Sequence, residues 1–338
     1  MNADTSIKKN EQGLNLSLKE RIEIIRSNRY FLMVFPFVML ALIILVFSIA
    51  TQGNFFRPSV LKGVFSQAII IGTCATGVAF IYSNGNLDIS IGAVLGMAAT
   101  LGVLTYNATQ SALLFVLVSM GSALVLMTFN CTMSVIFHIK TITVAIVVIQ
   151  IYGAITTLFI GGAGKIEIPY EISASMEDGG FRYIAFFIYF AFCVVIYHYT
   201  KVGRELRFLG GNANCARQTG MSDSKATYIS FLMTGLGVGL AAIFSVIDVS
   251  AVSVETGSGL GMDVMLATVL GGMSIFGGAR SNAYAGLLGA LTVAALNKGL
   301  LMVGVSSAFI QAIRGLVFLA LVYLNSERQS LLPSRVQF

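Results

Sequence analysis

The chain alternates between long apolar segments and short polar connections. Most of the apolar segments reach the roughly 20 residues that a helix needs to cross about 30 Å of hydrocarbon. A backbone inside lipid has to satisfy its own hydrogen bonds, so we expect helices, whereas a β-barrel would show alternating strands of about ten residues. The pattern therefore predicts an all-α integral membrane protein with about ten transmembrane helices. The ten apolar segments are residues 30–50, 61–82, 90–106, 111–137, 141–162, 182–199, 227–247, 264–277, 283–303 and 307–325.

The polar stretches divide the chain into three parts. Residues 1–29 form a polar N-terminal segment, residues 30–325 hold all the apolar segments, and residues 326–338 form a polar tail. The first apolar segment is too long for the apolar core of a signal peptide, so we expect it to remain as a membrane anchor. Apolar side chains of residues 17–26 share one helical face, which predicts an amphipathic helix on the membrane surface or against the bundle.

Charged residues are scarce and unevenly distributed. Only 11% of the residues are charged and 56% are hydrophobic, against about 25% charged in a typical soluble domain. Ten spans place both termini on one side, and the segments of that side hold 15 of the 21 lysines and arginines. The segments of the other side hold five, and the acidic residues gather there. Because cytoplasmic loops are enriched in basic residues, both termini are predicted to be cytoplasmic. In a membrane protein the net charge of +6 reflects this distribution of lysine and arginine, so we expect no nucleic-acid partner.

Spans two to five and spans seven to ten share features and would run in opposite directions. Asp88 precedes a short, glycine-bearing span in the first set, and Asp263 precedes another in the second. Asn130 and Asn297 then occupy comparable late positions. Inverted repeats are common in transporters, where paired short segments indicate the solute path. We therefore expect an inverted internal repeat with one or two short or broken helices.

A polar stretch at residues 83–92 interrupts the apolar sequence near the predicted inner face. It contains Asp88 and Ser90, and two interpretations of Asp88 stay open. The carboxylate caps the third span by accepting backbone N–H groups, or it belongs to a broken-helix gate beside the solute path. Asp263 allows the same two interpretations at the predicted outer face. These residues, with Asn130 and Asn297, are candidates for the path and its gates.

Arg314 lies near the middle of the last span, one turn after Gln311. A charge at that depth costs roughly 3 kcal/mol on insertion scales, so the side chain should face the bundle or water. Structural pairing and a role in the solute path both remain open for Arg314 and Gln311. The sequence does not identify a partner for the charge.

Two connections are long: the acidic outer one at residues 163–181 and the basic inner one at residues 200–226. In the inner connection, Asn212 is placed to cap a short helix that ends at Gly220. Such a helix is either a simple connector or a docking site for a partner protein. The length and basic character of this connection favour docking.

The chain lacks the motifs of the common enzymes. Gly164-Lys165-Ile166 misses the preceding glycine and the Ser/Thr of a P-loop. His138 and His198 are the only histidines, and no G-x-S-x-G motif is present. The four cysteines have no metal-ligand spacing, so we expect no metal site and interpret them as buried filler. An enzymatic function is therefore not expected.

Four stretches stand in an order that resembles a known family. They are Leu87-Asp88-Ile89-Ser90-Ile91-Gly92; Gly203-Arg204-Glu205 with Gly210-Gly211-Asn212, Ala216-Arg217 and Gly220; Val269-Leu270-Gly271-Gly272-Met273-Ser274 with Gly277-Gly278-Ala279-Arg280; and Leu296-Asn297-Lys298-Gly299-Leu300 with Gly304-Val305-Ser306-Ser307. The set resembles the permease subunits of ABC importers for simple sugars, the ribose-type class. Residues 138–143 and 212–221 depart from the usual family pattern, which leaves the solute and the pairing partner open.

The resemblance implies a subunit that works with separate partner proteins. These are an ABC ATPase at the inner face, a second permease copy or a paralogue, and an extracytoplasmic solute-binding protein. It also implies a place in the bacterial inner membrane, in contact with its lipid. The stretch from Gly203 to Gly220 would be the ATPase-coupling segment, and ATP would be used by the partner, with no cofactor on this chain.

We therefore predict a transmembrane permease subunit that translocates a monosaccharide or a similar small polar solute. The competing hypothesis is an ion-coupled secondary transporter, which the repeat and Arg314 also fit. A channel or a membrane scaffold is a third, weaker option.

Overall fold

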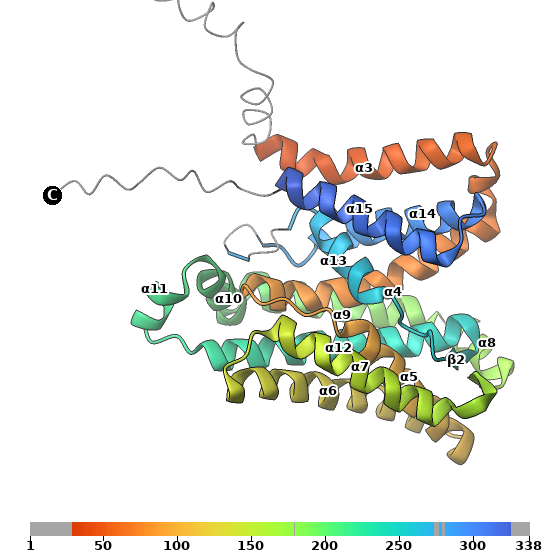
Figure 1. The fold of residues 1–338 in the computed structure, drawn as a ribbon, viewed down its shortest axis with the longest axis horizontal. Coiled ribbons are helices and arrows are strands. Elements are labelled where there is room, and N and C mark those ends of the chain that lie inside the picture. Colours follow the sequence, from red (N-terminus) through yellow and green to blue (C-terminus); the bar gives the residue numbers. More distant parts are fainter. Residues whose placement is uncertain (1–28, 179, 274–276, 279–280, 326–338) are drawn as a thin grey trace, which may run out of the picture.

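The computed structural model describes residues 29–178, 180–273, 277–278 and 281–325, which form a helical bundle (Figure 1). The elements, in chain order, are α3 (Arg29–Ala50), η1 (Asn54–Phe56), α4 (Pro58–Ser83), α5 (Ile91–Thr109), α6 (Ala112–Phe137), α7 (Thr141–Ile160), η2 (Gly161–Ala163), β1 (Lys165–Glu167), α8 (Tyr170–Asp178), α9 (Phe181–Tyr199), α10 (Lys201–Gly211), α11 (Ala213–Gln218), α12 (Asp223–Val249), β2 (Ala251–Ser253), α13 (Leu260–Leu270), α14 (Ala285–Met302) and α15 (Ser307–Asn325).

The apolar segments form helices, as the hydropathy pattern predicts. Among the described residues, seven helices are long and apolar enough to cross a membrane, namely α4, α5, α6, α7, α9, α12 and α14. Shorter apolar helices lie within α3, α13 and α15. The prediction of an all-α integral membrane protein is therefore confirmed. The expected amphipathic helix at residues 17–26 and the tail at residues 326–338 lie outside the described residues.

The eighth apolar segment forms one of the short helices that the sequence predicts. The apolar run covers residues 264–277, whereas α13 ends at Leu270 and its 11 residues extend over only about 16 Å. Gly271 lies so close to the backbone of Ala285 that no side chain fits there. Gly272 has a φ of 87°, a left-handed conformation that a helix cannot continue through. Glycine therefore ends α13 before it could cross a membrane.

The long helices α4 and α12 form an antiparallel pair at the centre of the bundle. Ser66, early in α4, donates a hydrogen bond to Asp248, late in α12. Further along the pair, Thr234 Oγ1 donates to the carbonyl oxygen of Gly77 at 3.0 Å. Both helices are mostly buried. Because the early part of one contacts the late part of the other, the two helices run in opposite directions.

The neighbouring helices form two related sets around this central pair. Glycines of each set pack on a helix of the other set, and α14 runs antiparallel to α4 just as α6 runs antiparallel to α12. The contacts that show these directions are Gly72 with Ala290, Gly286 with Ala75, Gly235 with Met127 and Gly239 with Met120. In the same way, α5 packs on α6 and α13 packs on α14. The sets α4–α7 and α12–α15 are therefore an inverted repeat, as the sequence predicts.

Different elements close the two ends of the bundle (Figure 1). At one end, α10 and α11 project beyond the long helices, and α3 begins and α15 ends near the same end. At the other end lie α8 and a small antiparallel sheet of β1 and β2, in which Ile166 pairs with Val252. The first end carries the connection that the charge pattern predicts to be cytoplasmic.

Candidate functional site

A buried polar cluster lies between α5, α6 and α7. The backbone N–H of Ser90 donates to Asp88 Oδ1 at 2.7 Å. Asn130 Nδ2 donates to Ser90 Oγ at 3.0 Å, and Tyr152 Oη donates to Asn130 Oδ1 at 2.7 Å. None of these four residues is more than 4% exposed. The hydrogen bonds offset part of the cost of removing these polar groups from water, whereas Asp88 Oδ2 has no hydrogen-bond partner among the described residues.

The position of Asp88 corrects one detail of the sequence analysis. Helix α5 begins at Ile91 and its N-cap residue is Ser90, so Asp88 is not itself the cap. The Asp88 carboxylate nevertheless accepts the N–H of Ser90, at the start of that helix. Residues 84–90 run from the end of α4 back into the bundle before α5 starts (Figure 1). Asp88 therefore stabilises the start of a helix and also lies in a broken-helix segment.

A second buried polar cluster lies between α13, α14 and α15. Asn297 Nδ2 donates to Asp263 Oδ2 at 3.1 Å. Arg314 Nε donates to Asn297 Oδ1 at 2.8 Å and lies 3.1 Å from Asp263 Oδ1. The side chains of Arg314 and Asp263 are only 12% and 5% exposed. Arg314, whose partner the sequence does not identify, is thus held in a charge-paired triad.

The prediction that Asp263 lies at the outer face is wrong. Asp263 is 4% exposed and pairs with a residue in the middle of α15. The reason is the segment after β2, which runs into the bundle before α13 begins, so that Gly261 packs against the backbone of Ile89. Because its first turn lies inside the protein, α13 carries Asp263 to the interior.

The two clusters occupy corresponding places in the inverted repeat. Each has an aspartate at the start of a repeat's second helix, an asparagine late in its third helix, and a hydrogen-bonding partner in its fourth helix. The corresponding pairs are Asp88 with Asp263, Asn130 with Asn297, and Tyr152 with Arg314. The sequence analysis missed Tyr152. The signal that could have found it is a polar side chain near the middle of span five, as Arg314 is near the middle of span ten.

Four glycines, which we call the glycine seam, bring the starts of α5 and α13 together. They are Gly92 and Gly96 of α5, Gly257 of the preceding segment and Gly261 of α13. A Cβ added at any of them would lie closer than 3.0 Å to a backbone carbonyl oxygen of the facing segment. Glycine at these positions therefore allows the two segments to meet backbone to backbone between the repeats.

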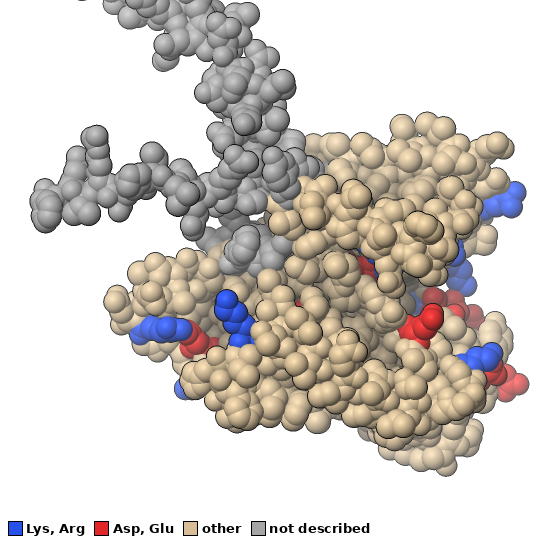
Figure 2. All heavy atoms as spheres, viewed as in Figure 1, with Lys and Arg blue, Asp and Glu red and all other residues tan. Residues whose placement is uncertain are grey.

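Gln311 stands apart from the second cluster because its side chain is exposed, as is that of Gln150 in α7. Both lie inside long apolar helices, where an exposed amide facing lipid would lack hydrogen-bond partners. Figure 2 shows the front face of the molecule hollowed between α15 and α7, with acidic and basic side chains visible in the hollow. The two helices that carry these glutamines therefore border a polar recess.

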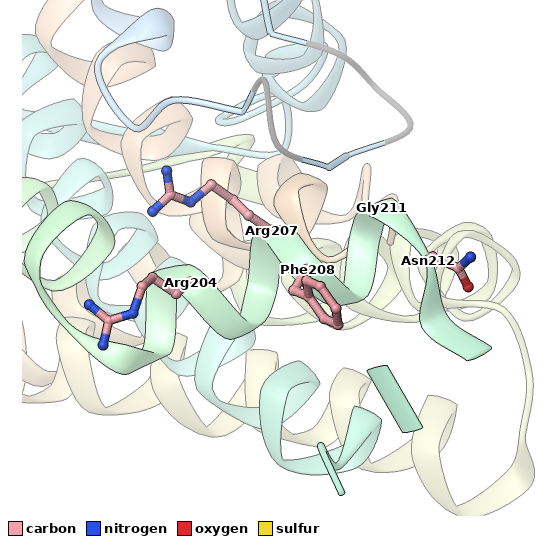
Figure 3. Close-up of a pocket in the computed structure, with 5 residues that line it drawn as sticks. All are labelled: Arg204, Arg207, Phe208, Gly211 and Asn212. Carbon is pink, nitrogen blue, oxygen red and sulfur yellow. The ribbon is translucent and has the colours of Figure 1, made fainter. Parts of the chain in front are cut away.

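The α10–α11 elbow, residues 201–218, projects from its end of the bundle, and many of its residues are exposed. Leu206 and Leu209 of α10 are buried against the bundle, whereas Phe208 is 47% exposed. Arg204, Arg207 and Phe208 line a shallow hollow with Gly211 and Asn212 (Figure 3). A basic surface with an exposed aromatic side chain is typical of a protein contact rather than of a simple connector.

The residues predicted for the coupling segment fall into two groups. An exposed group comprises Arg204, Gly211, Asn212, Arg217 and Gly220. Asn212 Oδ1 accepts the backbone N–H of Cys215 at 3.1 Å, so the predicted cap of the short helix is confirmed.

The other group packs inward and cannot meet a partner protein directly. Gly203 lies against the backbone of Tyr197, Gly210 lies against that of Ser83, and Ala216 is fully buried. Their small size permits these close contacts. The spacing of the motif alone does not distinguish the two groups, because both lie on the same short helices.

Residues 60–322 match the family described as the permease component of branched-chain amino acid transport systems. The match covers most of the chain and includes both polar clusters and the elbow. The chain belongs to this family. It is therefore a transport permease, a multi-pass membrane protein rather than an enzyme.

Curated relatives match most of the chain in sequence. The ribose import permease protein RbsC of Escherichia coli (strain K12) is 24% identical over 86% of this chain and 93% of its own length. The probable ABC transporter permease protein YphD of the same organism is 27% identical over 93% of this chain and 94% of its own. The autoinducer 2 import system permease protein LsrC of Escherichia coli O9:H4 (strain HS) is 27% identical over 78% of each chain. No solved structure matches the chain.

These relatives help to distinguish the two functions that the sequence allows, an ABC importer permease and an ion-coupled secondary transporter. The names of all three describe permeases of ABC or import systems, and none describes an ion-coupled carrier. The comparison therefore supports the ABC permease and gives no support to the secondary transporter.

Proposed function

We propose that this chain is the transmembrane permease subunit of an ATP-binding cassette importer that carries a monosaccharide or a similar small polar solute. Its family and its relatives for ribose and autoinducer 2 support this proposal. The structural observation that carries it is the α10–α11 elbow, which presents an exposed aromatic and basic surface outside the bundle. A carrier that works alone has no need of such a surface.

The elbow is the docking site for the partner ATPase in this proposal. Phe208 would insert into an apolar hollow of that partner, and Arg204 would meet its acidic groups. ATP is bound and hydrolysed on the partner, and this chain needs no cofactor of its own. The elbow end is then cytoplasmic, with both chain termini on the same side, and the membrane is the bacterial inner membrane. The end that holds α8 faces the extracytoplasmic solute-binding protein.

A second permease copy or a paralogue completes the solute path in this proposal. At the glycine seam the two repeats meet backbone to backbone, which leaves no space for a sugar between α5 and α13 at this point. The helices that carry the exposed Gln150 and Gln311 instead border the recess on the surface (Figure 2), and amides are suitable partners for sugar hydroxyls. Two such recesses facing each other would enclose a polar path away from lipid.

The proposal is tested with the purified chain, its ATPase and its binding protein reconstituted in proteoliposomes. We expect uptake of labelled ribose or another monosaccharide only when ATP and both partners are present. The Arg204→Glu/Phe208→Ala variant should lose most of its ATPase binding, because it removes the exposed contacts of the elbow. Uptake should fall with the loss of binding.

The matched control is Lys165→Glu, an exposed charge reversal at the opposite end of the bundle. This variant should bind the ATPase as tightly as wild-type protein does. Uptake that responds to an imposed ion gradient without ATP would contradict the proposal and revive the secondary transporter.

A further inference from the structure

Gly210, in the last turn of α10, joins the elbow to the interior of the bundle. A Cβ added to Gly210 would lie well inside 3.0 Å of the carbonyl oxygen of Ser83 and 2.8 Å from the nitrogen of Gly278. The N–H of Gly278 also donates to that Ser83 carbonyl at 3.4 Å. Three backbone segments therefore meet at this point with no side chain between them: α10, the end of α4, and the loop after α13.

The neighbouring Gly211 has a different environment. A Cβ added to Gly211 would meet no atom of the described residues within 4 Å, and Gly211 is exposed. Both glycines lie in the same turn of α10, where glycine is unfavourable compared with alanine. The close approach of Ser83 and Gly278 therefore requires a glycine at position 210. The described residues place no such requirement on position 211.

The segments that meet Gly210 lead to both polar clusters. Ser83 is followed directly by residues 84–90, which carry Asp88. Gly278 belongs to the loop that follows α13, the helix of Asp263. The contact at Gly210 thus connects the elbow to a broken-helix segment in each of the two repeats.

A second contact links the elbow side of the bundle to residues 84–90. Asn84 Nδ2 and Asn86 Nδ2 both donate to Thr227 Oγ1, at 3.1 and 3.4 Å. Thr227 lies near the start of α12, just after the elbow, and Asp223 at that start pairs with Arg217 of α11. The broken-helix segment is therefore held from two sides by elements that connect to the elbow.

We propose that Gly210 is the positioning residue that transmits movement of the ATPase from the elbow to residues 84–90 and to α13. This inference rests on the proposed function, because it assumes that an ATPase docks on the elbow. Packed backbone cannot absorb a displacement as a flexible side chain can, so a shift of α10 has to move Ser83 and Gly278 with it. Both polar clusters are then driven by the same contact, and the two repeats change conformation together.

The test compares Gly210→Ala with Gly211→Ala in the complete importer. For both variants we expect normal co-purification with the ATPase, because neither changes the exposed side chains of the elbow. The added methyl group at 210 separates α10 from Ser83, so solute transported per ATP hydrolysed should fall about tenfold, within the usual range of coupling between sites. Gly211→Ala should keep the wild-type ratio. Equal ratios in the two variants would overturn the proposal.

A second pair of variants adds no volume to the side chain. It keeps the proposal testable if Gly210→Ala does not fold. Thr227→Val removes the acceptor of Asn84 and Asn86 at constant shape, and we expect a severalfold loss of solute per ATP with normal ATPase binding. Thr157→Val is the control, because its hydroxyl makes the same type of bond to the carbonyl four residues earlier. Identical transport ratios for Thr227→Val and Thr157→Val would count against the proposal even if Gly210→Ala did not accumulate.

These outcomes can be separated from failure of the proposed function. If wild-type protein neither binds an ATPase nor transports with ATP, the function itself is wrong. If wild-type protein transports and Gly210→Ala matches Gly211→Ala, the function stands and only the role of Gly210 is wrong.

Discussion

At the scale of single residues, the two polar clusters show how the same geometry can carry different charge. Asp263 and Arg314 form an ion pair, whereas the corresponding Asp88 is held by Ser90 and has a tyrosine in the place of the arginine. A buried charge whose partner is removed keeps its full cost of desolvation. The second cluster should therefore be the more sensitive of the two to loss of one member.

We expect Arg314→Gln to destabilise the protein by about 3–5 kcal/mol, because Asp263 is left as an uncompensated buried carboxylate. Asp263→Asn/Arg314→Gln should recover much of this loss, since no buried charge remains. Thermal unfolding in detergent of both single variants and the double variant would measure the effect. Strictly additive losses would show that the two side chains do not act as a pair.

Tyr152→Phe tests the first cluster without changing any charge. It removes the hydroxyl that donates to Asn130 at 2.7 Å and leaves the Asn130 oxygen without that donor. We expect a loss of about 1–3 kcal/mol, the usual cost of an unsatisfied buried polar group, in the same unfolding experiment. Tyr228→Phe is a matched control, because its longer bond to Thr132 is only partly buried. A larger effect at Tyr228 would contradict the importance of this cluster.

At the scale of elements, the glycine seam decides how closely α5 and α13 approach. Carbonyl oxygens of each segment lie where the side chains of the other would be, at Gly92, Gly96, Gly257 and Gly261. Helix contacts in lipid depend on close packing rather than on a hydrophobic driving force, so small residues contribute strongly there. The seam thus holds the two broken-helix segments together.

Gly92→Ala should therefore destabilise the protein by about 1–3 kcal/mol or prevent its accumulation, because the added Cβ overlaps the carbonyl of Gly257. Gly121→Ala, at a position in α6 with open space, should be neutral or stabilising by up to about 1 kcal/mol. Expression level and thermal stability in detergent compare the two variants. Similar behaviour of both would argue that the seam is loosely packed.

At the scale of the whole molecule, the bundle presents one native cysteine for labelling. Cys74, Cys131 and Cys193 are buried as the sequence predicts, whereas Cys215 in the elbow is exposed, so the interpretation as buried filler is wrong for Cys215. If the elbow is cytoplasmic, a membrane-impermeant maleimide should label native protein in inside-out vesicles and not in spheroplasts. Cys215→Ser should abolish the labelling. Labelling in spheroplasts would reverse the proposed orientation.

The hydropathy pattern alone determined the class of protein and most helix boundaries. Lipid accepts a backbone only when it is internally hydrogen-bonded, so long apolar segments leave little choice except helices. Charge and composition in the same way identified Arg314 as a residue that needs a partner. The repeat could be inferred from Asp88, Asp263, Asn130 and Asn297 because polar residues are rare enough in these spans to be informative.

What the sequence could not determine depends on contacts between distant segments. The end of α13 at Leu270 follows from its approach to Ala285, and the burial of Asp263 follows from a segment that enters the bundle. Gly210 and Gly211 are identical neighbours in the chain, yet only Gly210 meets Ser83. Tertiary structure alone decides such differences, because hydropathy depends on residue type, whereas packing depends on which backbone lies opposite.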